Sequence, residues 1–213
     1  MYPAGNLLIP VAHGHLEALL KEPRQGPAQA VALVLHPHPL GGGTMHNKVV
    51  FRAASALNDA GLTTLRINFR GVGQSTGTHD EGRGELDDVR AGLDYLAGNY
   101  PDKSITICGF SFGARMGLDV GIKDDRVKYL IGIGTPLDKY NFSFLQACRK
   151  PLLLVHGEHD EFGDVEQVRA LAAELKKHTQ VRLVVIPGAA HFFENRLDEL
   201  KQAITEWITK QLG

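Results

Sequence analysis

A glycine-flanked serine near the middle of the chain constrains the fold more than any other feature. Residues 105–108 form the short apolar run Ile-Thr-Ile-Cys, and Gly-Phe-Ser-Phe-Gly follows at 109–113. Gly-x-Ser-x-Gly is the pattern of a nucleophile elbow, a sharp strand-to-helix turn that holds the serine hydroxyl clear of a sheet. The two backbones approach so closely there that side chains two residues before and after the serine would collide. We therefore predict that Ser111 is a nucleophile at the end of a buried strand.

The rest of the chain alternates strand-like and helix-like segments. Residues 30–35 are an unbroken apolar run, typical of a strand buried on both faces. Residues 7–20 alternate around a glycine, which predicts an antiparallel hairpin at one edge of the sheet. Further strands are expected at 62–69, 104–108, 127–133, 152–156 and 181–186, and helices near 47–58, at 84–97, after 164 and from 197 onward. The pattern predicts an α/β fold, doubly wound around a mostly parallel sheet, in a single domain spanning 1–213.

Two loops downstream of the elbow carry the partners that a serine nucleophile needs. A serine hydroxyl needs an imidazole to take its proton, and the imidazole needs a carboxylate to hold its tautomer. Only two histidines follow the candidate acid, and His178 ends a helix among lysines, whereas His191 follows a strand. We therefore expect His191 to be the base. Asp160, in the loop after the strand at 152–156, is the favoured acid.

Other carboxylates remain open as the acid. Glu158 and Asp164 are neighbours of Asp160 that could replace it, and Asp138 follows the preceding strand, where such acids also occur. The active site itself is expected beyond the carboxyl ends of the strands, because ligands of open parallel sheets bind there.

Composition excludes several other classes of function. The formal net charge of the 213-residue chain is −1, which gives no electrostatic reason to expect nucleic acid or a membrane surface as a partner. No apolar run reaches the ~18 residues of a membrane span, and the first residues lack the pattern of a secretory signal. With only Cys108 and Cys148, a reduced, cytoplasmic protein is expected. Its oligomeric state is not indicated.

Metal and cofactor sites are not expected either. Histidines occur in close pairs at 13–15, 36–38 and 156–159. These pairs are scattered, lack the helical His-Glu-x-x-His spacing, and have no companion carboxylate at a recognised distance along the chain. We predict a hydrolase that needs no metal and no cofactor.

Five segments together resemble the α/β-hydrolase superfamily, and more closely small lidless bacterial hydrolases akin to dienelactone hydrolases and short-chain carboxylesterases. They are residues 36–45, 68–75, 109–113, 156–160 and 188–193. The resemblance implies an eight-stranded sheet, a triad of Ser111, Asp160 and His191, and acyl-group hydrolysis. Dienelactone hydrolases proper use a cysteine nucleophile, so the serine argues against the dienelactone substrate. Residues 135–150 leave no room for the cap domain that larger relatives carry between the sixth and seventh strands.

The same resemblance suggests where the oxyanion hole lies. One donor should be the N–H of Phe112, immediately after the nucleophile, and the other should come from the loop after the strand at 30–35. The prolines at 37 and 39 have no N–H, so His38 is the expected second donor and Leu40 the next choice.

An open pocket beside Ser111 should take a short-chain carboxylic ester, with a thioester or a small peptide as the alternative substrate. The side chains expected to wall this pocket are Leu40, Phe110, Phe142, Phe144 and Phe192.

Overall fold

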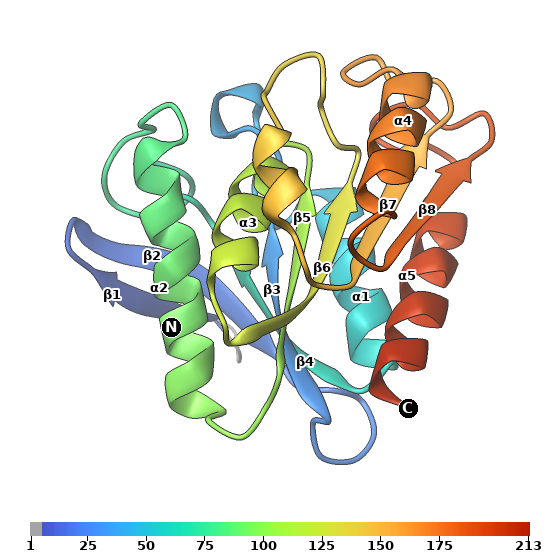
Figure 1. Ribbon diagram of the computed structural model, residues 1–213. Coiled ribbons are helices and arrows are strands. Elements are labelled where there is room, and N and C mark those ends of the chain that lie inside the picture. Colours follow the sequence, from blue (N-terminus) through green and yellow to red (C-terminus); the bar gives the residue numbers. More distant parts are fainter. Residues whose placement is uncertain (1–5) are drawn as a thin grey trace.

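The computed structural model describes residues 6–213. The expectation that the chain carries no secretory signal rests on its first residues, and most of these lie outside the described range. Eight strands form one sheet in the order β1-β2-β4-β3-β5-β6-β7-β8 (Figure 1). The strands are β1 (Asn6–Val11), β2 (Gly14–Lys21), β3 (Ala30–Leu35), β4 (Leu62–Ile67), β5 (Ile105–Phe110), β6 (Val127–Ile133), β7 (Leu152–Gly157) and β8 (Val181–Ile186).

The sheet is parallel from β4 through β8, and the hairpin of β1 and β2 joins it antiparallel at one edge. The central strands β3, β4, β5 and β7 are buried along their whole length. This burial explains why β3, β5 and β7 are nearly continuous apolar runs, since both faces of a parallel sheet are covered by helices. Strand β4 differs, because it also buries Thr63, Thr64 and Arg66. The predicted α/β fold with an eight-stranded, mostly parallel sheet is confirmed.

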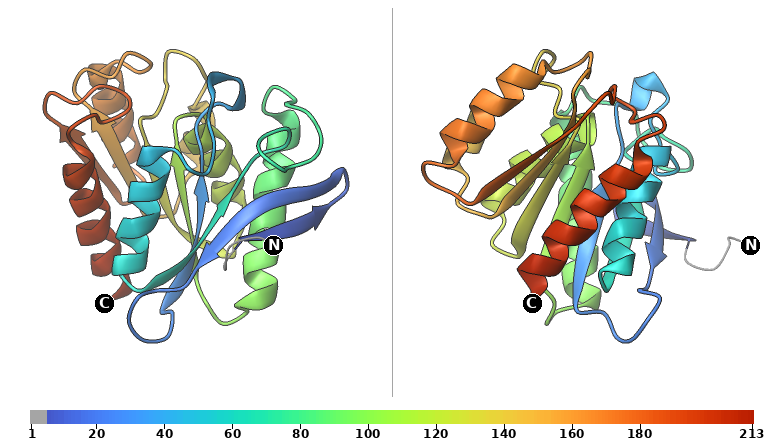
Figure 2. Two further views of the ribbon diagram at one scale, coloured as in Figure 1. Left: turned by 180° about the vertical axis from the view of Figure 1, so that it is seen from behind. Right: turned by 90° about the vertical axis from the view of Figure 1, so that its right-hand side faces the viewer.

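Within residues 6–213, five α-helices cover the two faces of the sheet. They are α1 (Lys48–Asp59), α2 (Arg83–Asn99), α3 (Phe112–Lys123), α4 (Val165–Leu175) and α5 (Leu197–Leu212). The buried side chains of α2, α3 and α4 share one apolar core on one face. Those of α1 and α5, including Trp207, share a second core. Figure 2 shows these two helices on the opposite face of the sheet. The apolar stripe of the last helix is therefore core packing, as its spacing indicates.

Strand β4 ends two residues earlier than the sequence predicts, for a reason that bears on the site. Asn68 leaves the strand, and its Oδ1 accepts the N–H of Met45 at 2.8 Å. The N–H of Phe69 is donated to His36 Nε2 at 3.0 Å. These two residues thus connect β4 to the loop after β3 instead of continuing the ladder of the sheet.

The connection between β6 and β7 is short. Residues 134–151 contain only a five-residue 3-10 helix, η2 (Ser143–Ala147), so no cap domain covers the carboxyl ends of the strands. None of the helices in residues 6–213 combines the length and the apolarity that crossing a membrane would take.

Candidate active site

Ser111 stands in the turn between β5 and α3 with a strained backbone. Its φ is 55° and its ψ is −116°, a combination that L-residues rarely adopt. A Cβ added at Gly109 would lie 2.3 Å from the carbonyl oxygen of Gly113. A Cβ at Gly113 would lie 2.6 Å from the carbonyl oxygens of Leu35 and His36 at the end of β3. Both glycines are therefore required by close backbone approach, as the elbow pattern predicts.

The structure brings Ser111, His191 and Asp160 together in one continuous chain of hydrogen bonds. His191 Nε2 lies 2.9 Å from Ser111 Oγ, and His191 Nδ1 lies 2.8 Å from Asp160 Oδ2 and 2.9 Å from Oδ1. The side chains of His191 and Asp160 are almost entirely buried. An ionised carboxylate only accepts hydrogen bonds, so Nδ1 carries the proton and Nε2 faces the serine as an acceptor.

The remaining candidate acids are engaged elsewhere. Asp138 accepts a hydrogen bond at 3.0 Å from a glutamine side chain of α4, and Asp164 caps the N-terminus of the same helix. Glu158 accepts a backbone N–H of the loop after β8 at 2.8 Å. Of the four carboxylates considered from the sequence, Asp160 is the one that contacts His191.

Three aromatic rings surround the His191 imidazole. The ring centroids of Phe162, Phe110 and Phe192 lie 4.6, 4.9 and 5.2 Å from its own. The backbone N–H of His191 is donated to the side chain of Glu161 at 3.2 Å. The rings restrict the rotation of the imidazole, so both of its nitrogens remain directed at their partners.

The N–H groups of Phe112 and His38 donate no hydrogen bond within residues 6–213. Phe112 is the first residue of α3, where backbone donors have no partner inside the helix. The N–H of Leu40, in contrast, is donated to His38 Nδ1 at 3.1 Å. The two first-choice oxyanion donors are thus unpaired, whereas the second choice is occupied.

The loop that carries His38 is held in place by the buried histidine before it. His36 Nδ1 donates to the carbonyl of Pro37 at 2.6 Å, while its Nε2 accepts the N–H of Phe69. Burial lowers the pKa of His36 to about 4, so the ring stays neutral and can keep accepting at Nε2. After it, the carbonyl of His38 accepts the N–H groups of Gly41 and Gly43. These internal hydrogen bonds keep the loop rigid, while the N–H of His38 itself stays unpaired among the described residues.

A cavity of about 570 Å³ opens beside Ser111 and His191. Leu40 and Phe192 line it as expected, and both are well exposed, at 77% and 42%. The other walls come from Pro37, His38, residues 41–43, Asn47, Pro136, Lys139, Tyr140 and Phe162. Four of these residues were not predicted from the sequence, although they follow the ends of β6 and β7, where ligands of parallel sheets bind: Pro136, Lys139, Tyr140 and Phe162.

Three predicted pocket residues do not line this cavity. Phe110 is 1% exposed and lies in the core on the α1 and α5 side, against the ring of His191. Phe142 and Phe144 pack on each other with ring centroids 5.7 Å apart. The guanidinium of Arg115 lies 4.5 Å from the Phe144 ring. The prediction was wrong for these residues. Phe110 packs in the core between the sheet and helices α1 and α5, whereas Phe142 and Phe144 pack beside Arg115 of α3.

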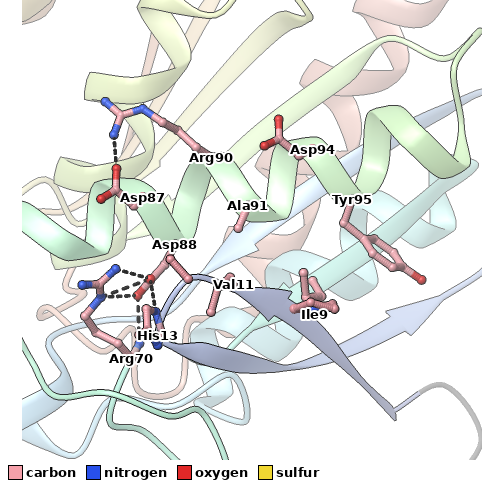
Figure 3. Close-up of a pocket in the computed structure, with 12 residues that line it drawn as sticks. Ile9, Val11, His13, Arg70, Asp87, Asp88, Arg90, Ala91, Asp94 and Tyr95 are labelled. Carbon is pink, nitrogen blue, oxygen red and sulfur yellow. Dashed lines mark hydrogen bonds and ion pairs between the residues drawn. The ribbon is translucent and has the colours of Figure 1, made fainter.

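A larger hollow of about 770 Å³ lies between β1 and α2 and shares no lining residue with the Ser111 cavity (Figure 3). Its charged groups pair with one another: Asp88 accepts hydrogen bonds from Arg70 at 2.7 to 3.1 Å and contacts His13 at 3.2 Å. Arg90 donates to Asp87 at 2.6 Å. Asp94, the remaining charged residue of the lining, accepts from Arg126 at 2.7 Å, so the charged side chains that line the hollow are all paired. Within residues 6–213, moreover, no three His, Cys, Asp or Glu side chains gather closely enough to hold a metal ion.

The chain belongs to the alpha/beta hydrolase domain family, whose profile matches residues 30–210. It is 40% identical over 189 residues to the uncharacterized protein RP471 of Rickettsia prowazekii, covering 85% of this chain and 79% of that protein.

Two solved structures are also similar. An alpha-beta serine hydrolase homologue from Coxiella burnetii is 37% identical, with a TM-score of 0.90 over 98% of this chain and 99% of that one. XC6422 from Xanthomonas campestris, described as a serine hydrolase without lid, is 32% identical, with a TM-score of 0.88 over 99% and 97%. The fold and these relatives together support hydrolase activity.

Proposed function

We propose that the protein is a serine esterase that cleaves short-chain carboxylic esters through an acyl-enzyme on Ser111. The observation that carries this proposal is the continuous relay from Asp160 through His191 to Ser111 at the mouth of an open cavity. His191 Nε2 takes the hydroxyl proton as Oγ attacks the ester carbonyl, and Asp160 stabilises the imidazolium that forms. The imidazolium then gives this proton to the departing alcohol, and a water molecule releases the acid by the same steps in reverse order.

Two backbone donors, the N–H groups of Phe112 and His38, are proposed to stabilise the negative charge that develops on the carbonyl oxygen. Both are unpaired among the described residues, and His38 lies in a loop whose other groups are internally satisfied. Preorganised donors of this kind are worth about 2.7–4 kcal/mol each in related chemistry. They need no reorganisation at the moment of reaction, which is why a rigid loop suits this role.

Replacement of the nucleophile tests this proposal directly. Ser111→Ala should fold normally and hydrolyse p-nitrophenyl acetate at least about a thousandfold more slowly than the parent, because only binding and the oxyanion hole remain. Ser143→Ala, at an exposed serine of η2, is the matched control and should retain full activity. The parent should also react with a serine-directed fluorophosphonate, and the Ser111 variant should not. Activity of Ser111→Ala within tenfold of the parent would exclude Ser111 as the nucleophile.

The open cavity favours short acyl chains, of roughly two to six carbons. A closed tunnel would reward each added methylene by about 0.8 kcal/mol, or about fourfold in kcat/KM. Here no cap domain encloses the cavity, and Leu40 at its mouth is 77% exposed, so longer chains leave the protein surface and gain little. The measurement is kcat/KM for p-nitrophenyl esters from acetate to palmitate below their micelle concentrations. A maximum at ten carbons or more would contradict the open-cavity proposal.

The same triad could act on thioesters or small peptides, because it determines the acyl-transfer chemistry and leaves the leaving group open. A comparison of p-nitrophenyl acetate, acetyl-CoA and an acetyl-amide substrate separates these activities.

We further propose a small-molecule substrate in the cytoplasm, with neither nucleic acid nor membrane as a partner. Both cysteines, Cys108 and Cys148, are free and buried, and burial raises the pKa of each thiol, so neither is poised to react.

A further inference from the structure

Three aromatic rings contact one another beside the candidate site, and two of them are the side chains of the proposed oxyanion donors. The ring centroids of His38 and Phe112 lie 5.1 Å apart. The ring of His79, from the loop between β4 and α2, lies 4.9 Å from that of His38 and 5.8 Å from that of Phe112. The side chains of both donor residues thus contact one another and also share a third partner. The sequence analysis assigned no role to His79.

A fully buried carboxylate anchors His79. Glu85, in the first turn of α2, is 0% exposed, and its Oε1 lies in close contact with His79 Nδ1, at 2.7 Å, without forming a regular hydrogen bond. Glu85 also accepts the backbone N–H groups of Asp80 and Gly82 at 3.0 and 2.8 Å. One side chain therefore holds the imidazole and the backbone on both sides of residue 81. The loop cannot move without breaking buried polar contacts, which is costly.

The end of this loop also abuts the elbow itself. A Cβ added at Gly82 would lie 3.8 Å from Cε2 of Phe112 and 3.2 Å from Cε of Met116. The ring of Phe112 is held on its other sides by Phe69 and Tyr140, with centroid distances of 5.5 and 6.0 Å. The His79 loop thus supplies one wall of a packed aromatic cluster in which the side chain of Phe112 is fixed.

We propose that His79, anchored by Glu85, is a positioning residue for the oxyanion hole, and that its ring sets the relative placement of the backbone N–H groups of His38 and Phe112. This inference rests on the proposed esterase function. The two donors come from separate strand-end loops, after β3 and after β5, and no hydrogen bond among the described residues joins their backbones directly. The two strand ends already meet where Gly113 approaches the carbonyls of Leu35 and His36. Ring packing adds the contact between the side chains of the donor residues themselves. Because donors must lie 2.7–3.1 Å from the oxyanion, a small displacement of either loop weakens transition-state binding more than substrate binding.

The test compares His79→Ala with His79→Phe, which keeps an aromatic ring at the same place. For p-nitrophenyl acetate, His79→Ala should lower kcat by about 10- to 100-fold with KM changed less than about threefold, since one misplaced donor costs up to about 10²–10³. The inhibition constant of a trifluoromethyl ketone, which forms a tetrahedral adduct on the serine, should rise by the same factor as kcat/KM falls. His79→Phe should recover both values to within about threefold of the parent.

His13→Ala is the matched control, because it removes a comparable contact between a histidine and a buried carboxylate of α2, that of His13 with Asp88 at 3.2 Å, away from the oxyanion rings. It should leave kcat and the inhibition constant unchanged. If His79→Ala does not fold, His79→Leu, which fills a similar volume without a ring, is judged by the same criteria.

The inference fails if the ringless variant folds and keeps both values within threefold of the parent. It also fails if His79→Phe is folded and as slow as the ringless variant. A parent protein that hydrolyses none of the esters would instead overturn the proposed function.

Discussion

Replacing the Asp160 carboxylate by an amide should damage catalysis through the tautomer of His191. In the structure, Asp160 Oδ1 accepts the backbone N–H of Phe162 at 2.9 Å and also lies 2.9 Å from His191 Nδ1, whereas Oδ2 makes the shorter contact with Nδ1, at 2.8 Å. In Asp160→Asn, keeping the bond to Phe162 places the amide oxygen at the Oδ1 position. The amide NH₂ then faces Nδ1 and donates to it. When this NH₂ donates to Nδ1, the imidazole carries its proton on Nε2, and Nε2 can no longer accept the proton of Ser111.

The opposite orientation of the amide is disfavoured by the same geometry. It would direct the NH₂ group at the N–H of Phe162, leaving a partly buried donor without its acceptor at a cost of about 1 kcal/mol. The wrong tautomer therefore dominates, and kcat should fall by ~10⁴, equivalent to about 5.5 kcal/mol in the activation free energy. The isosteric change leaves packing intact, so the KM for p-nitrophenyl acetate and the melting temperature should change little.

Asp138→Asn provides the control for this experiment. Asp138 accepts a hydrogen bond from Gln167 on α4 and does not contact His191, so its replacement should leave kcat within about twofold of the parent. Steady-state kinetics of both variants, with circular dichroism to verify folding, decide the matter. A mild effect at Asp160 together with a severe one at Asp138 would refute the tautomer argument and assign the acid to the loop after β6.

Two further predictions concern stability. Because burial lowers the pKa of His36 from 6.5 to about 4, the unfolded chain takes up a proton below pH 6.5 that the folded chain does not. Because of His36, the free energy of unfolding of the parent should fall by up to about 3 kcal/mol as the pH drops from 6.5 to 4. In His36→Gln, the free energy of urea unfolding should depend less steeply on pH. Parallel pH curves for the two proteins would contradict this. Gly113→Ala should destabilise the protein by more than about 2 kcal/mol, since its Cβ would lie 2.6 Å from two carbonyl oxygens. Gly98→Ala, in α2 with nothing within 4 Å, should stabilise it by about 0.5–1 kcal/mol, so equal melting temperatures for the two variants would refute the packing argument.

The α/β fold could be predicted from the sequence alone. So could the meeting of Ser111, Asp160 and His191 at one edge of the sheet. The strands buried on both faces are continuous apolar runs, so their positions follow from local pattern. The elbow glycines at 109 and 113 are also a local requirement, because the collision that excludes a Cβ occurs within a few residues and with the neighbouring strand. Parallel strands place their carboxyl ends together, so three strand-end loops had to meet.

Tertiary structure decided which carboxylate contacts His191 and which rings face the cavity. Asp138, Glu158, Asp160 and Asp164 are chemically similar and all follow strands, and only the partners they find in space distinguish them. Local pattern likewise does not reveal that Phe110 lies beneath the imidazole while Phe162 faces the cavity.

The contacts of His79 with His38 and Phe112 join segments 41 and 33 residues apart along the chain. No periodicity or spacing encodes such contacts, because they arise when separate loops pack together at the end of the sheet. The chemistry of the site is thus readable in the sequence, whereas the placement of its supporting side chains depends on long-range packing.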